Sequence, residues 1–440
     1  MTVVRSTSGR RVLLLSVAVT LVLPAAFAQD RQPATQATIR ADGTLLVDDR
    51  PVFPVGIHTE DVDSISRIAE AGFNLVSGTG EWEAAHYEAA AAHDLLILGG
   101  HYVWATFASF RTGGGIDLKP SEEAGIQNVL THGRDQSWRM PLDTLSAFDH
   151  LPGVIGWRTN EEPEAKLVEY MEYAYEIFKS NSPGHLVVTL SCDPRWFRAF
   201  RNTADVLVFD NYPYRGGAGP KRTVLETYEW TRQGVEAMEG KAVWLMPQLI
   251  PPSYWSLDPK DGLSLQQMRL QNYAGLIAGA KGVVMYTYGS FPLVFERDED
   301  GSRAKRPASE EVMSRRWERV SALVRELNEL GPVLCDARPT QELDIRWLEP
   351  GSLGPGPQMT RELDLYGRKY LLVANVLDVP LAGTVYGING GNQRAYDASV
   401  WLGEGALSVR AERPGEPTLT IAPQGTGVFV LTRRPVTISE

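Results

Sequence analysis

The chain has 440 residues, with 43 basic and 54 acidic side chains and a formal net charge of −11. This acidic balance argues against nucleic acid or an anionic membrane surface as a partner. It suits a soluble protein that meets neutral or cationic small molecules.

The first residues have the pattern of a secretory signal. Three arginines precede the apolar run Val12–Leu23, and the small-x-small stretch Ala26-Phe27-Ala28 follows it. The run is short for a membrane span, so we expect cleavage of residues 1–28, with an uncleaved N-terminal anchor as the alternative. Cleavage removes three basic residues and no acidic one, which leaves a net charge of −14. The sequence thus predicts a secreted or periplasmic protein without membrane contact after cleavage, and a flexible linker over residues 29–36.

From about residue 37, short apolar runs alternate with longer amphipathic segments. Continuous apolar runs indicate strands that are buried on both faces, as parallel sheets require. The eight runs are Val52–Ile57, Leu75–Ser77, Leu95–Gly99, Val154–Trp157, Leu186–Leu190, Val206–Phe209, Ala242–Met246 and Gly282–Tyr286. Helical segments such as DVDSISRIAEAGF and SEEVMSRRWERVSALVRELNEL lie between or after them. Eight such units over about 300 residues favour a (β/α)8 TIM barrel, with a doubly wound open sheet as the competitor.

The helical pattern ends near Gly331-Pro332, and the chain beyond it reads as short strands separated by Gly, Pro and Asn. This pattern is typical of an antiparallel sandwich. The sequence therefore predicts an α/β chain with a barrel over residues 37–332 and a small antiparallel β-sandwich over residues 333–440. We interpret the sandwich as a structural module packed against the barrel, because it has no planar strip of aromatic residues for carbohydrate.

The stretch GVIGWRTNEEPE is unusual for the end of a buried strand. Two adjacent carboxylates, Glu161 and Glu162, stand between Asn160 and Pro163, although neighbouring carboxylates repel and are costly to desolvate. In a barrel this stretch lies at the C-terminal end of strand four, the face where barrel enzymes build their sites. The alternative is that the pair caps the following helix, since acidic residues are favoured at helix N-termini.

The stretch GWRTNEEP resembles the acid/base strand of the clan A glycoside hydrolases, which include cellulase-type and β-galactosidase-type barrels. Those proteins carry Trp, a few residues and then Asn-Glu-Pro or Asp-Glu-Pro. Further stretches resemble their first, second and sixth strands and their seventh helix with eighth strand, namely DDRPVFPVGIHTED, EAGFNLV, ADVLVFDNYPY and QNYAGLIAGAKGVVMYTYG. The resemblance covers about residues 40–330. It implies glycoside hydrolysis of an oligo- or polysaccharide, with Glu162 as general acid/base and Glu161 where the family has a residue that contacts the sugar 2-hydroxyl. Asn160 stands one place early, and a substrate contact is expected for it too.

The second carboxylate that glycoside hydrolysis requires is not where the family has it. There the nucleophile is a Glu at the end of strand seven, and the matching residue here is Gln248, an amide. Three explanations stay open. Asp210, at the end of strand six, is one partner, and strands four and six would hold the groups far enough apart for an inverting course. A loop acid is the second explanation, with Glu60, Glu81 and Glu296 as candidates. In the third, the barrel is a non-catalytic carbohydrate-binding pseudo-glycosidase.

Aromatic and histidine side chains follow several of the expected strands. Sugars stack their C–H faces on aromatic rings and hydrogen-bond to amides and carboxylates. The predicted substrate contacts are His58, His101, Trp104, Tyr212, Gln248 and Tyr286, and the segment from Gly99 to Thr131 is expected to form a wall of the cleft. For each histidine a structural role is an equal alternative.

The sequence gives no support for a metal or another cofactor. It has no CxxC pair, no HExxH motif and no close cluster of histidines. The two cysteines, Cys192 and Cys335, lie far apart, and two buried thiols are favoured over a disulfide.

Overall fold

The fold is taken from a computed structural model of the chain. It describes residues 34–78, 82–100, 145–160, 162–163, 168–215, 222–256, 261–299, 302–348, 358–387, 396–403, 405–413 and 416–433. The predicted signal and the predicted cleft wall beyond residue 100 lie outside these ranges. Within them, no helix combines the length and the apolarity that crossing a membrane demands.

Eight parallel strands close into a barrel in which each strand pairs with its neighbours in the sequence. The strands are β4 (Val55–His58), β5 (Leu75–Ser77), β6 (Leu96–Gly100), β7 (Val154–Arg158), β8 (Leu186–Ser191), β9 (Val206–Asn211), β10 (Ala242–Pro247) and β11 (Val283–Met285). Each overlaps one of the eight apolar runs, so the barrel prediction is confirmed. The first run is divided, because β4 begins only after Phe53-Pro54.

Both faces of the barrel strands are buried, which explains why their sequences are continuously apolar. In β9, Val206 and Val208 belong to the cluster that fills the barrel, whereas Leu207 and Phe209 belong to the cluster beneath the helices. Side chains alternate in this way along every strand. The alternation places the next residue, Asp210, on the inner face.

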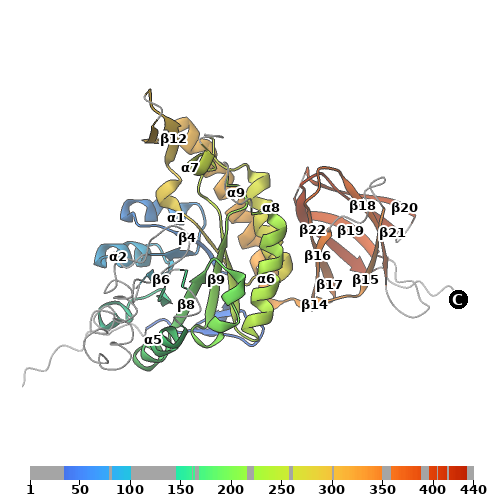
Figure 1. Ribbon diagram of the computed structural model, residues 1–440. Helices are drawn as coiled ribbons and strands as arrows, with labels where there is room; N and C mark the ends of the chain where they lie inside the picture. Colours follow the sequence, from blue (N-terminus) through green and yellow to red (C-terminus); the bar gives the residue numbers. More distant parts are fainter. Residues whose placement is uncertain are drawn as a thin grey trace, which may run out of the picture. The chain divides into compact units, whose positions relative to one another are not determined.

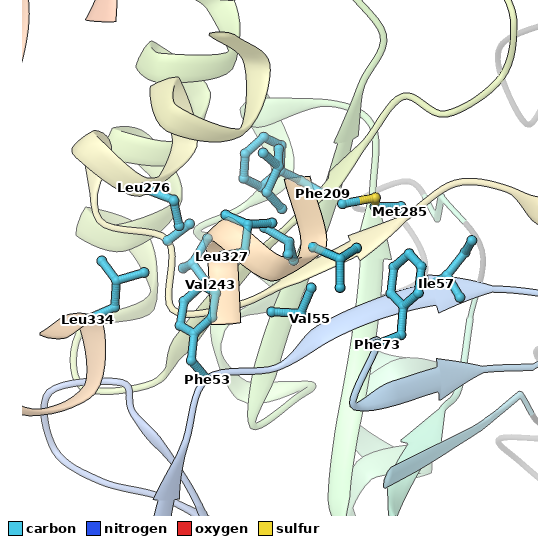
Figure 2. Packing of buried hydrophobic residues seen from close by; sticks show 14 of the residues in the cluster. Phe53, Val55, Ile57, Phe73, Phe209, Val243, Leu276, Met285, Leu327 and Leu334 are labelled. Atoms are coloured by element: carbon cyan, nitrogen blue, oxygen red, sulfur yellow. The ribbon is translucent and has the colours of Figure 1, made fainter. Parts of the chain in front are cut away.

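Helices surround the barrel (Figure 1). They are α1 (Ile65–Glu70), α2 (Ala84–Ala92), α5 (Val168–Asn181), α6 (Val224–Met238), α7 (Ser253–Ser256), α8 (Leu265–Ala278) and α9 (Glu310–Asp336). Figure 2 shows how Leu276 of α8 and Leu327 of α9 pack onto Val55 and Val243 of the strands. The described chain between β8 and β9 has short 3-10 turns, Pro194–Trp196 and Ala199–Asn202, in place of an α-helix.

A three-stranded antiparallel sheet closes the N-terminal end of the barrel. Its strands are β1 (Ala37–Ile39), β2 (Leu45–Val47) and β3 (Arg50–Val52), and Ala37 and Leu45 complete the interior cluster. The sequence analysis missed this sheet. Within the described end of the predicted linker, Thr35 Oγ1 accepts a hydrogen bond from Gly153 N (2.9 Å) and Gln36 N donates to Asp48 Oδ1 (2.9 Å).

Helix α9 extends beyond the domain junction that the sequence suggested. Gly331-Pro332 lies inside the helix, which ends at Asp336. Proline removes one helix hydrogen bond. The buried residues Leu330, Val333 and Leu334 on either side of it continue the apolar face of α9 against the barrel. The helical pattern therefore ends four residues later than predicted.

The C-terminal strands form two antiparallel sheets, as predicted. One has the order β14 (Arg338–Thr340), β16 (Gln358–Leu365), β17 (Arg368–Asn375), β22 (Thr426–Arg433) and β19 (Tyr396–Leu402). The other has the order β15 (Leu343–Leu348), β18 (Leu381–Gly387), β21 (Glu416–Ile421) and β20 (Leu407–Arg413). Helix α8 packs against β16, β17 and β22, and Arg361 Nη1 donates to Leu276 O of α8 (2.6 Å). The sandwich is thus packed on the barrel.

A short hairpin follows the last barrel strand and was not expected from the sequence. It consists of β12 (Leu293–Arg297) and β13 (Arg303–Pro307). Phe295 of the hairpin packs edge-to-face on Tyr254 of α7, with ring centroids 4.9 Å apart. Because β10 precedes α7 and β11 precedes the hairpin, both lie on the side where the barrel strands end.

A polar network at the N-terminal end of the barrel joins the closing sheet to α9. Asp42 accepts hydrogen bonds from Arg40 Nη2 (2.9 Å) and Thr44 N (3.1 Å), and Lys281 Nζ lies 3.5 Å from its carboxylate. Lys281 Nζ also donates to Leu334 O (3.1 Å). Burial raises the pKa of Asp42, but Arg40, Thr44 and Lys281 outweigh burial and hold it below its ordinary value.

We expect Asp42→Asn to lower the free energy of unfolding at pH 7 by less than about 1 kcal/mol, because the carboxylate is half exposed. A lowered pKa stabilises the fold above the ordinary Asp value, and this contribution is lost as the pH falls below about 4. Urea unfolding of both proteins from pH 7 to pH 3 measures the difference. A difference that stays constant over this range would contradict the assignment.

Candidate active site

Three neighbouring barrel strands bring Glu162, Cys192 and Asp210 together. In the barrel order β8 lies between β7 and β9, with Arg158 paired to Val188 and Ser191 paired to Phe209. Glu162 follows β7, Cys192 follows β8, and Asp210 is the second-last residue of β9. Since the strands are parallel, their C-terminal ends meet at one mouth of the barrel.

The two carboxyl groups lie close to each other. One oxygen of Glu162, one oxygen of Asp210 and the Cys192 sulfur all lie within 4.8 Å of one another. Asp210 is 2% exposed, and Glu162 is half-buried. Retaining glycosidases separate their carboxyl groups by about 5–5.5 Å and inverting ones by about 6.5–9.5 Å. The nearest oxygens of Glu162 and Asp210 thus approach more closely than was expected for strands four and six.

The backbone of Glu162 adopts a conformation that non-glycine residues avoid. Its φ is 44°, in the left-handed region, directly before Pro163. Such residues are uncommon and cluster at functional sites. The carboxylate lies beside the Cys192 thiol and Asp210, and, in addition to burial, its interaction with the thiol raises the pKa of that thiol. At this position the Glu162 side chain lies at the barrel mouth, beside residues from the ends of β8 and β9.

Arg222 fixes the backbone under Cys192 and Asp210. Its Nη1 donates to Asp210 O (3.3 Å) and its Nη2 to Cys192 O (3.4 Å). The guanidinium also lies over the ring of Trp230, 4.8 Å from the centroid. One side chain thus joins the ends of β8 and β9. Sequence reasoning singled out neither Arg222 nor a site role for Cys192, and only the position of Cys192 at the end of strand five could have indicated one.

A row of stacked rings lies across the barrel mouth beside these residues. The His58 and Tyr286 rings stack at 5.3 Å, and the Tyr286 and Tyr212 rings at 5.9 Å. The Arg215 guanidinium lies 5.3 Å from the centroid of the Tyr212 ring. The structure therefore brings together three residues that were predicted as substrate contacts, from the ends of β4, β9 and β11.

The amides of Asn160 and Gln248 bind the protein itself. Asn160 Oδ1 accepts from Leu190 N (3.1 Å), and its Nδ2 donates to Thr189 Oγ1 (3.2 Å). Gln248 Oε1 accepts from Tyr214 N (3.0 Å), and its Nε2 donates to Ile250 O (2.9 Å). These bonds give each amide a structural role. Their predicted substrate contacts stay predictions.

The structure describes only two of the remaining predicted residues. Glu161, His101, Trp104 and Glu81 lie outside the described residues. Glu60 lies near His58, with Glu60 Oε1 3.9 Å from His58 Nε2, and Glu296 pairs with Arg306 at 2.7 Å. Among the three explanations for the second carboxylate, the described structure places Asp210 next to Glu162.

Glu162, Cys192 and Asp210 also form the one group, among the described residues, that would offer a metal ion three ligand atoms. Burial raises the pKa of the Cys192 thiol, and the charges of Asp210 and Glu162 raise it further. A thiol binds metals as the thiolate, so a metal bound here would displace the thiol proton. Neither cysteine forms a disulfide.

No protein-family model matches the chain, and no curated protein matches its sequence. Solved structures do match its fold. A structure described as a glycoside hydrolase superposes with a TM-score of 0.57 at 13% identity, over 90% of this chain and 96% of that one. A glycoside hydrolase family 5 structure from Bacteroides vulgatus gives 0.58 at 14% identity, over 90% and 93%. The resemblance to a clan A barrel with a C-terminal β-sandwich is thus confirmed for the fold.

We expect Glu162→Gly to be more stable than Glu162→Ala by about 1 kcal/mol, because only glycine adopts a positive φ without steric cost. Both variants remove the carboxylate, so alanine is the matched control for its loss. Urea unfolding of the two proteins measures the difference. Equal stabilities would show that the backbone at this position carries no strain.

Proposed function

We propose that the protein is an O-glycosyl hydrolase that cleaves an oligo- or polysaccharide, with Glu162 as general acid/base and Asp210 as the second carboxylate. The observation that carries the proposal is the close approach of these two carboxyl groups at the barrel mouth. The fold shared with glycoside hydrolase structures supports it. So does the gathering of His58, Tyr286 and Tyr212 at the barrel mouth, where aromatic side chains are suited to a sugar.

The close approach of the nearest Glu162 and Asp210 oxygens favours a retaining course. Glu162 protonates the glycosidic oxygen while the Asp210 carboxylate attacks the anomeric carbon, so that the leaving group departs and a glycosyl ester forms. Glu162 then takes a proton from water. The water oxygen attacks the same carbon and releases Asp210 as a carboxylate, which restores the starting state.

A carbohydrate-binding protein without catalysis is the second candidate, and the observation in its favour is Gln248. This amide occupies the position where clan A enzymes have their nucleophile, and it is hydrogen-bonded to backbone atoms of neighbouring loops. In this candidate the stacked rings bind sugar and the carboxylates hydrogen-bond to it.

Glu162→Gln should lower kcat by about 10²–10⁴-fold on natural glycosides, because the leaving oxygen loses its proton donor. The loss should be much smaller on dinitrophenyl glycosides, whose leaving group departs without protonation. Asp210→Asn should lower kcat on both kinds of substrate. Hydrolysis rates over a panel of aryl glycosides and polysaccharides measure these effects.

Glu60→Gln and Glu296→Gln are the controls, because they remove the other two candidate acids within the described residues; both should keep kcat within a few-fold of wild type. Proton NMR of the first product should show the anomeric configuration of the substrate. If the wild type binds glycans in calorimetry but hydrolyses none of the panel, the binding protein replaces the enzyme.

We further propose that the protein is secreted or periplasmic, on the strength of the charged, apolar and small-residue pattern in residues 1–28. Expression of the full chain in a bacterium with an export pathway should give a processed protein outside the cytoplasm. N-terminal sequencing should begin near Gln29. Intact Met1 in a membrane fraction would support the uncleaved anchor.

A further inference from the structure

Cys192 lies between the two carboxyl groups and has no part in the reaction proposed above. Its strand, β8, is the neighbour of both β7 and β9, and its sulfur is within 4.8 Å of an oxygen of Glu162 and of Asp210. In addition to burial, interaction with the Glu162 carboxylate raises the pKa of the thiol, as expected for a thiol that can donate to it. The sulfur is therefore placed to influence where that carboxylate points.

The position of Cys192 is fixed from its backbone. Arg222 binds the carbonyl oxygens of both Cys192 and Asp210, and the Trp230 ring holds the guanidinium in place. The side chain of residue 192 therefore starts from a defined point relative to Asp210. A substitution there changes the group beside Glu162 and leaves this anchor intact.

The thiol keeps its proton at neutral pH and so acts as a donor. Burial raises its pKa, the negative charges of Asp210 and Glu162 raise it further, and Arg222 opposes them. A thiol is a weak donor, but hydrogen bonds to an ionised acceptor are stronger than those between neutral groups. A hydrogen bond from the Cys192 thiol to Glu162 is thus strongest when Glu162 is a carboxylate, the form that acts as base in the second step.

We propose that Cys192 is a positioning residue, whose thiol holds the Glu162 carboxylate toward Asp210. The role in turnover rests on the proposed hydrolase function, whereas the contact itself can be tested without any substrate.

The first test measures the reactivity of the thiol in the native protein. In a Cys335→Ser background, mass spectrometry follows the modification of Cys192 by methyl methanethiolsulfonate between pH 6 and pH 10. Cys335 itself is 4% exposed, and burial raises its pKa to about 11. Glu162→Gln and Asp210→Asn should each speed modification at pH 8 several-fold, because removing a nearby negative charge favours the thiolate.

Asp193→Asn is the matched control, because this neighbouring carboxylate is engaged in hydrogen bonds with Arg195. It should leave the rate unchanged. Equal rates in all three variants and in the Cys335→Ser parent would overturn the contact.

The second test uses turnover. Cys192→Ala should lower kcat about tenfold or more, the effect expected for one hydrogen bond to a charged group, with KM within twofold. Cys192→Ser keeps a donor and should restore most of the loss. Wild-type kcat in both variants would overturn the positioning role and leave the hydrolase proposal standing. If the wild type hydrolyses no glycoside, the hydrolase proposal fails and the thiol rates alone decide whether Cys192 holds Glu162.

Discussion

Because eight parallel strands close on themselves, the residues that follow them are brought to a single mouth, whatever their distance in the sequence. Glu162, Cys192 and Asp210 span almost 50 positions, yet they come from three adjacent strands and meet within 4.8 Å. The apolar filling of the barrel makes this possible, since Val208 and the other interior residues fix the strand register that places Asp210 on the inner face. The aromatic row depends on the same closure, because His58 and Tyr286 come from the first and last strands.

The second carboxylate of the proposed hydrolase, Asp210, would come from a different strand end than the nucleophile of clan A enzymes. In clan A enzymes the nucleophile follows strand seven, where this chain has Gln248. The side-chain amide of Gln248 has a structural role, because it hydrogen-bonds to the backbone of both Tyr214 and Ile250. The backbone N–H of Gln248 donates to Gln271 Oε1 at 3.1 Å. An amide supplies both a donor and an acceptor to these loops, which a carboxylate cannot do. In the proposed hydrolase the neighbouring strand, β9, carries the acid in its place.

The barrel strands were predictable because burial on both faces leaves a local mark, a continuous apolar run, in the sequence. The end of α9 was not predictable from Gly331-Pro332, because the packing of Leu330 and Val333 on the barrel outweighs the local preference of proline. At the site, the resemblance and the repulsion between adjacent carboxylates pointed to Glu162. Arg222 left no signal of this kind. Its role depends on two backbone carbonyls, Cys192 O and Asp210 O, that become neighbours only when the barrel closes.

The carboxylate pair at the barrel mouth lowers the stability of the fold, and this loss distinguishes hydrolysis from simple binding. Burial removes the Asp210 carboxyl group from water and places it beside another acidic group, that of Glu162, and both effects are unfavourable for charged carboxylates. The positive φ of Glu162 adds backbone strain. Costs of this kind concentrate where the chemistry of a protein needs them. A binder of neutral sugars needs aromatic surface and a few hydrogen bonds, and it needs no second acid. Binding alone therefore leaves the carboxylate pair unexplained, whereas glycoside hydrolysis uses both of its members.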